Sequence, residues 1–251
     1  MKLGIVTYNI AKDWDVPTLI KMCETVGLEA VELRTTHAHK VEPTLSARER
    51  AAVRKQFEAS KVRLLSLGSV CEFHSPDPDE VRRNIEECHK FVDLAYDLGA
   101  AGVKVRPNNL PDEVAPEKTI RQIGESLRTC GEYAAPKRIG IWVEVHGRKT
   151  CDPRLIRQMI DIADHPSVGV CWNSNETDLI DGSIKPAFYL LAAHIRNVHI
   201  NDLWSPYPYR QLFALLKEIG YEGYCLAEIQ ASAEPERLLR HYRALWIEMC
   251  R

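Results

Sequence analysis

The sequence has 251 residues, of which 45% are hydrophobic, and its 33 basic and 35 acidic residues leave a formal net charge of −2. This balance gives no electrostatic footprint for nucleic acid or for an anionic membrane surface, so neither is expected as a partner. No apolar run approaches the roughly 20 residues of a membrane span, and the start MKLGIVTYNI is strand-like, without the pattern of a signal peptide. The eight cysteines include no Cys-x-x-Cys pair, which favours reduced, mostly buried thiols in a cytoplasmic protein.

Runs of strand-forming residues alternate with longer segments of helical periodicity along the whole chain. In chain order, strands are predicted at residues 3–8, 28–33, 62–67, 101–105, 140–145, 168–172, 195–200 and 223–228. Helices are predicted near residues 16–26, 45–60, 78–98, 116–135, 153–163, 184–193, 208–219 and 234–248. Apolar residues spaced i, i+3, i+4 and i+7, as between Leu212 and Ile219, are typical of a helix with one face in a core.

Eight strands that alternate with eight helices indicate repeated parallel βαβ units. The chain has about 31 residues per unit, the length expected of such a building block. A closed (β/α)8 barrel fits better than an open doubly wound sheet, because the segment TYNIAKD after the first strand is not a glycine-rich phosphate loop. No linker rich in glycine, serine or proline interrupts the pattern, so we expect one domain over residues 1–251.

Polar residues gather at the carboxyl ends of the predicted strands, which face a shared pocket in such a barrel. They are Glu32, Arg34, Glu72, His74, Lys104, Arg106, Asn108, Glu144, His146, Asn173, Asn175, Asn197, His199, Glu228 and Gln230. Several buried carboxylates in one cavity are costly unless they are compensated, and a divalent cation would compensate them. The alternative is an ordinary polar barrel end, in which these residues hydrogen-bond to one another or to Lys104 and Arg106.

Four successive strand ends each offer one donor to a cation: Glu144, Asn173, His199 and Glu228. Three oxygens and one imidazole suit Mn²⁺ or Mg²⁺, with Zn²⁺ or Co²⁺ as alternatives, better than an ion that prefers thiolate. Asn173 directly follows a buried strand, so its amide either ties off a loop or faces a ligand. Asp202, three residues after His199, is a candidate partner for the imidazole.

Several segments resemble the xylose-isomerase-like barrel superfamily of sugar phosphate isomerases and epimerases. The most specific are HIRNVHIND, in the seventh predicted strand, and LLKEIGYEGYCLAEI, which leads to the glutamate of the eighth. WVEVHG resembles the motif of the fifth strand, in which a histidine follows two residues after a glutamate. The resemblance extends over nearly the whole chain and implies a sugar or polyol substrate, a divalent metal, and an assembly of two or four copies.

The metal of this family is typically held by a glutamate, an aspartate, a histidine and a glutamate on strands five to eight. These positions fall on Glu144, Asn173, His199 and Glu228, so the second ligand is an amide in place of a carboxylate. The family often has a histidine three residues after the aspartate, where this chain has Glu176. A set with one fewer negative charge predicts weaker metal affinity.

The resemblance also implies a reaction in which the metal polarises the carbonyl of an α-hydroxycarbonyl sugar and carboxylates exchange a proton on the neighbouring carbon. We expect Glu144 and Glu228 to exchange the proton, or to act as metal ligands alone. His146 is expected to contact a hydroxyl or carbonyl of the substrate, or to bond to a neighbouring strand.

The remaining charged and polar side chains near the strand ends also have expected roles. Lys104 and Arg106 are expected to bind a phosphate or carboxylate of the substrate, or to neutralise Glu32 and Glu72. Asn175 is expected to contact the substrate from the end of the sixth strand. Two histidines in the loop after the second strand, His37 and His39, are expected to be exposed.

Three other functions stay open on the sequence. A lyase of the inosose dehydratase kind would use the same pocket and expel a hydroxyl group from the enediolate. A barrel that binds a sugar without turning it over would fit the change to Asn173. A DNA-repair endonuclease of this barrel type fits poorly, because the strand-six histidine is absent and the net charge is −2.

Overall fold

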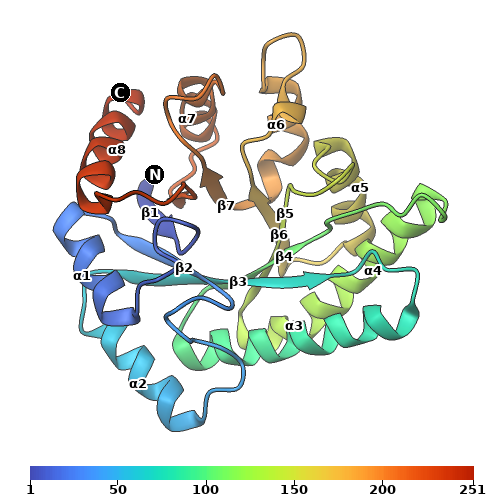
Figure 1. Ribbon diagram of the computed structural model, residues 1–251. Coiled ribbons are helices and arrows are strands. Elements are labelled where there is room, and N and C mark those ends of the chain that lie inside the picture. The colour runs from blue at the N-terminus through green and yellow to red at the C-terminus, as the bar shows by residue number, and fades with distance from the viewer.

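The computed structural model describes all residues 1–251, and eight parallel strands form its centre as a closed barrel in the order β1 to β8 (Figure 1). The strands are β1 Lys2–Val6, β2 Ala30–Arg34, β3 Arg63–Glu72, β4 Gly102–Arg106, β5 Gly140–Glu144, β6 Val168–Trp172, β7 Ile195–Ile200 and β8 Tyr224–Ala227. Pairing of β1 with β8 closes the barrel, with Leu3 opposite Cys225. The predicted fold is therefore confirmed.

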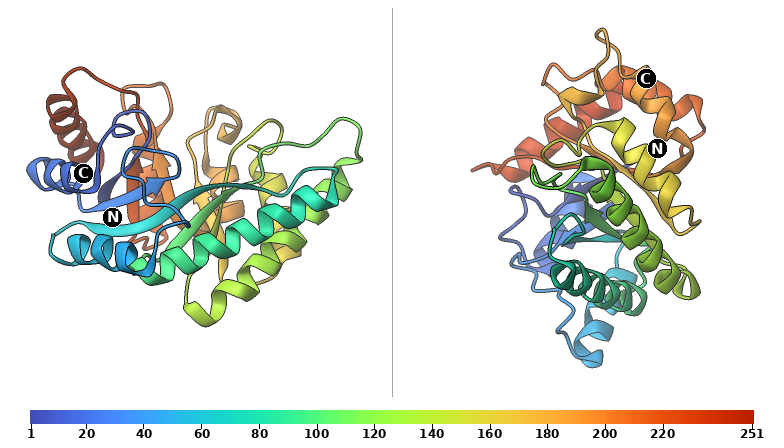
Figure 2. Two further views of the ribbon diagram at one scale, coloured as in Figure 1. Left: turned by 60° about the horizontal axis from the view of Figure 1, so that its bottom comes forward. Right: turned by 90° about the vertical axis from the view of Figure 1, so that its right-hand side faces the viewer.

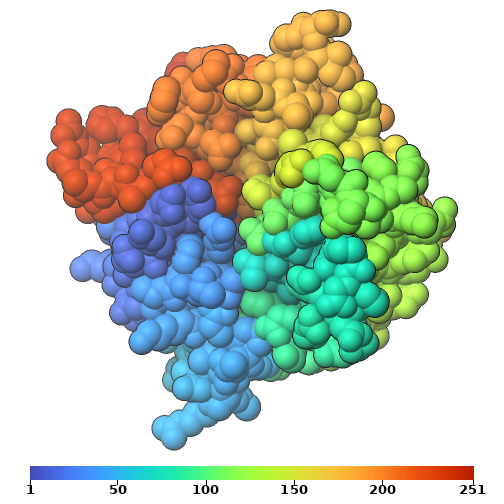
Figure 3. All heavy atoms as spheres, turned by 45° about the vertical axis from the view of Figure 1, so that its right-hand side comes forward, coloured from blue at the N-terminus to red at the C-terminus, as the bar shows by residue number.

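Eight helices alternate with the strands and surround the barrel (Figures 1 and 2). They are α1 Val16–Val26, α2 Ala47–Glu58, α3 Pro78–Leu98, α4 Pro116–Ala134, α5 Pro153–Ala163, α6 Lys185–Leu191, α7 Tyr209–Glu218 and α8 Pro235–Met249. Their ends follow local rules: Asp15 accepts a hydrogen bond from the Thr18 N–H at the start of α1, and Gly27 ends that helix with φ +82°. The N- and C-terminal parts of the chain lie side by side, as the surface in Figure 3 also shows.

The observed boundaries lie within two residues of the predicted ones except at the end of β3. β3 continues to Glu72, five residues beyond its predicted end, because its pairing with β4 shifts register between Gly68 and Glu72. This irregularity places Glu72 opposite Arg106. α6 ends at Leu191, and a 3-10 turn over Ala192–His194 completes the predicted helical segment.

The hydrophobic core has two parts. The larger comprises 63 buried residues and lies between the strands and the surrounding helices. The smaller consists of inward-facing strand residues, namely Val6, Ala30, Leu65, Trp142, Cys171 and Leu226. Six of the eight cysteines are buried, as predicted, and all eight are free thiols. No helix combines the length and the apolar character needed to cross a membrane.

Candidate functional site

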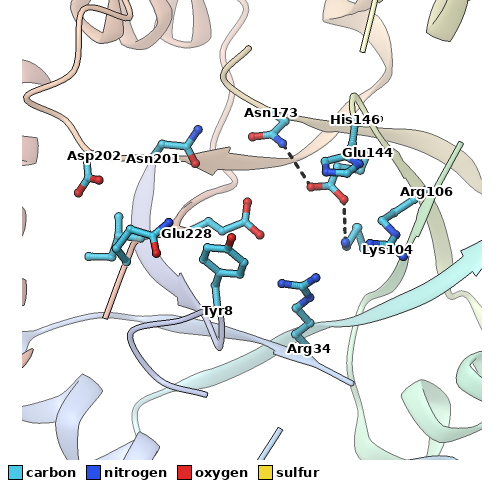
Figure 4. Close-up of a pocket in the computed structure, with 12 residues that line it drawn as sticks. Tyr8, Arg34, Lys104, Arg106, Glu144, His146, Asn173, Asn201, Asp202 and Glu228 are labelled. Carbon is cyan, nitrogen blue, oxygen red and sulfur yellow. Dashed lines mark hydrogen bonds and ion pairs between the residues drawn. The ribbon is translucent and has the colours of Figure 1, made fainter. Parts of the chain in front are cut away.

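A cavity of about 330 Å³ lies at the carboxyl ends of the strands (Figure 4). Ten of its twelve lining residues are not hydrophobic, and the full set is Tyr8, Arg34, Lys104, Arg106, Glu144, His146, Asn173, Asn201, Asp202, Glu228, Ile229 and Gln230. Most of these side chains come from strand ends that the sequence pattern had identified. Tyr8 and Asn201 were missed, although both closely follow strands, because a tyrosine and a lone asparagine carry no distinctive pattern.

Glu144, the last residue of β5, forms a buried ion pair with Lys104 of β4. The Lys104 Nζ lies 2.7 Å from Glu144 Oε2, and both side chains are less than 5% exposed. Burial alone would raise the pKa of Glu144, but Lys104 and His199 outweigh burial and hold this pKa well below its ordinary value. The acidic partner of Lys104 is therefore Glu144, whereas the sequence suggested Glu32 or Glu72.

His199 of β7 lies between three carboxylates. Its Nδ1 atom is 3.4 Å from Glu144 Oε1 and 3.5 Å from Glu228 Oε2. On the other side of the ring, Nε2 is 3.3 Å from Oε1 of Glu32, whose other oxygen accepts hydrogen bonds from Ser66 and Asn197. Glu32 therefore takes the position beside the imidazole that the sequence suggested for Asp202.

The arrangement of these groups fits a divalent cation. One ligand atom from each of Glu144, His199 and Glu228 lies within 4.8 Å of the others. Neither ring nitrogen of His199 has a hydrogen-bond partner: Nε2 lies 3.3 Å from Glu32, and Nδ1 faces the carboxylates of Glu144 and Glu228. Burial alone would lower the pKa of His199, but Cys171 and the carboxylates of Glu32 and Glu228 raise it well above its ordinary value. A cation or a proton is needed at this point to offset the repulsion.

Asn173 lies in the cavity with its amide nitrogen toward the carboxylates. Nδ2 donates to Glu144 Oε1 at 3.3 Å, while Oδ1 accepts from the Ser174 N–H at 2.9 Å. Ligation of a metal through Oδ1 would require the amide to flip and the Ser174 N–H to lose its acceptor. In this structure the Asn173 amide bonds to Glu144, and ligation of a metal by Asn173 stays a prediction.

Asn175 stabilises the loop after β6 through hydrogen bonds and does not line the cavity. Its side chain donates to the Val145 carbonyl at 2.7 Å, and its backbone N–H donates to Asp178 Oδ2 at 3.0 Å. Asp178 also accepts from the Tyr207 hydroxyl, but its buried Oδ1 has no partner. Burial raises the pKa of Asp178 to about 7.

This raised pKa predicts a pH dependence of folding stability. The protonated form of Asp178 is favoured in the folded chain, so its contribution is complete below pH ~4 and is lost as the pH rises through about 7. Asp178→Asn, which stays neutral, should reduce the loss of unfolding free energy between pH 5 and pH 8 by about 1–4 kcal/mol. Urea unfolding at both pH values measures this, with the exposed Asp181→Asn as control. The same pH dependence in both variants would contradict the assignment.

Arg106 and His146 complete one side of the cavity. Arg106 forms an ion pair with Glu72, which also accepts a hydrogen bond from Asn108 at 2.8 Å. The neutralising role suggested for Arg106 is therefore present in the structure. Burial lowers the pKa of His146, and its buried Nδ1 atom has no hydrogen-bond partner. A substrate contact from His146 stays a prediction.

One sequence-based expectation about the loop after β2 is wrong. His39 is 7% exposed, not on the surface. Its Nδ1 accepts from the Val41 N–H at 3.0 Å and its Nε2 donates to the Arg34 carbonyl at 2.8 Å, so the ring bonds to backbone at the end of β2. Two loop histidines separated by one residue carry no sequence signal for such burial.

Known structures share this architecture. The 3-keto-D-glucoside 4-epimerase YcjR from E. coli, in its apo form, superposes with a TM-score of 0.82 at 16% identity, over 100% of both chains. D-psicose 3-epimerase with D-tagatose, from Clostridium cellulolyticum H10, gives 0.86 at 15% identity, again over 100% of both chains. The IolI protein with a binding zinc atom gives 0.83 at 16% identity, over 100% of this chain and 98% of the other. At such identities the likeness shows the fold.

The sequence itself identifies the family. No curated protein sequence matches significantly. The family model "Xylose isomerase-like TIM barrel" matches residues 20–248, which include all the residues of the buried cluster around His199. This chain therefore belongs to the xylose isomerase-like TIM barrel family.

Proposed function

We propose that the protein is a metal-dependent isomerase or epimerase of a sugar or of a related polyol ketone. The observation that carries the proposal is that two carboxylates of a polar cavity, Glu144 and Glu228, lie within 3.5 Å of an unpartnered nitrogen of His199. The family and the titles of structural neighbours, which name sugar epimerases and a zinc-bound protein, support the same class. We expect a cytoplasmic protein. We also expect a homodimer or homotetramer, as the resemblance to the family implies.

Glu144, His199 and Glu228 would hold the cation, with Glu32 fixing the imidazole from behind. When bound there, a divalent ion supplies Lewis-acid polarisation of the sugar carbonyl. Mn²⁺ or Mg²⁺ suits the two carboxylates, and Zn²⁺ or Co²⁺ suits the imidazole. Asn173 contributes by orienting Glu144 through its amide nitrogen.

Proton transfer is assigned to the two carboxylates. One of them, Glu144 or Glu228, takes the proton from the carbon next to the carbonyl, and the electron pair of the C–H bond becomes part of the enediolate. The other carboxylate, carrying a proton taken up from solvent, returns it to the opposite face of the same carbon, which inverts that carbon. Return of the proton to the former carbonyl carbon, with transfer of the hydroxyl proton to the former carbonyl oxygen, moves the carbonyl instead. We expect His146 and Lys104 to contact substrate oxygens in the cavity that they line together with Arg106.

Incubation with a panel of ketoses in D₂O tests this function. We expect a deuterium atom in place of one C–H hydrogen, with no other change in composition, because the proton passes through groups that exchange with solvent. A chelator should stop the exchange and added Mn²⁺ should restore it. Loss of water from the product would instead assign a lyase, and absence of exchange with every ketose and metal would overturn the proposal.

A further inference from the structure

Arg34, at the end of β2, is the one cationic side chain of the cavity without an acidic partner. Lys104 pairs with Glu144 and Arg106 pairs with Glu72. Arg34 forms no ion pair, and its guanidinium donates no hydrogen bond to the protein, although it lines the same cavity. All five of its N–H donors remain free for a ligand.

The backbone of Arg34 is held in place by buried polar side chains. Its N–H donates to Thr7 Oγ1 at 2.8 Å, and its carbonyl accepts from His39 Nε2 at 2.8 Å. Thr7 is fully buried and His39 is nearly so. The Arg34 guanidinium lies 5.1 Å from the centre of the Tyr8 ring, which supports it without using its donors. The side chain is therefore positioned without being neutralised.

The charges of the cavity are distributed unevenly. In Figure 4, Arg34 lies on the side of Lys104 and Arg106, whereas Asp202 lies on the opposite side, beyond Glu228. An anionic group of a ligand would meet attraction at Arg34 and repulsion at Asp202. This asymmetry orients a ligand with its anion at Arg34 and its reacting carbon near the two carboxylates of the proposed site.

We infer that Arg34 binds an anionic group of the substrate, a carboxylate or a phosphate, so that the substrate is a sugar acid or a sugar phosphate. The planar guanidinium matches either group with paired N–H···O bonds. The inference rests on the proposed function, because it names the substrate class of the same site. It assigns to Arg34 the anion contact that the sequence suggested for Lys104 and Arg106, whose charges are neutralised by glutamates.

Binding of unreactive analogues tests the role of Arg34. Glucitol, gluconate and glucitol 6-phosphate share a polyol chain and lack an aldehyde or ketone, so none can be turned over. In calorimetric titrations with Mg²⁺ present, at least one anion should bind about 10- to 100-fold more tightly than glucitol. Which anion binds more tightly distinguishes a carboxylate from a phosphate. Added NaCl should reduce the preference.

Variants of Arg34 provide the decisive comparison. Arg34→Gln should remove most of the anion preference and leave glucitol affinity unchanged, and Arg34→Lys should keep part of it. The control Arg121→Gln removes one positive charge from the exposed face of α4 and should behave as the unmodified chain. Equal affinity of the unmodified chain for all three compounds would overturn the inference, as would an equal loss of glucitol and anion affinity in Arg34→Gln. If the anion contact of Arg34 were overturned in this way, the unmodified chain would still exchange deuterium into ketoses. Failure of the Arg34 inference can therefore be distinguished from failure of the proposed isomerase or epimerase function.

Discussion

Replacing Glu228 with glutamine is expected to reduce proton exchange with the substrate by about 10²–10⁴-fold while leaving the fold intact. Glutamine has nearly the same shape but cannot take up a proton. Glu228 is 14% exposed at its side chain and contacts His199 at 3.5 Å without pairing with Lys104 or any arginine. Its removal leaves no buried cation unpaired, so the loss should be catalytic and not structural.

Metal content separates the two roles of this carboxylate. Elemental analysis after dialysis against Mn²⁺, together with deuterium exchange, should show that Glu228→Gln keeps bound metal but has lost exchange. Glu222→Gln, an exposed substitution just before the start of β8, is the matched control and should keep both. If metal and exchange disappear together, ligation alone explains the loss. Unchanged exchange would rule out proton transfer by Glu228.

The alternation of strands and helices made the barrel predictable, because periodicity is a local property of the sequence. The same argument placed Glu144, His199 and Glu228 at one end, since the carboxyl ends of parallel strands meet there. The sequence pattern could not show which acidic and basic side chains form ion pairs. Lys104 lies opposite Trp142 in the β4–β5 register, yet its ammonium reaches Glu144.

Other features depend on atoms that no spacing rule describes. The amide of Asn173 turns its nitrogen toward Glu144 because the next backbone N–H, that of Ser174, occupies its oxygen. Glu32 is buried in the barrel and contacts His199. Its position in a strand is equally compatible with a salt bridge to lysine or arginine. These orientations and partners are determined by packing between strands that are distant in sequence.

Lys104→Met is expected to lower the unfolding free energy of the metal-free protein by about 3–5 kcal/mol. Methionine fills a similar volume, but it leaves the Glu144 carboxylate buried without the ammonium that lies 2.7 Å away in the unmodified chain. Urea unfolding in the presence of a chelator measures the effect. Lys90→Met, which breaks an exposed pair with Glu87, should change stability by no more than about 1 kcal/mol.

Added divalent metal should stabilise Lys104→Met more than the unmodified chain, because the cation compensates the charge that the lysine supplied. The double variant Lys104→Met/Glu144→Gln should regain much of the lost stability without metal, since both members of the ion pair are then neutral. If Lys104→Met alone is as stable as the unmodified chain, Glu144 is not an uncompensated buried charge in that variant. If only the double variant and the metal restore stability, Lys104 and the cation serve the same carboxylate, and the lysine holds the ligand cluster together until the metal binds.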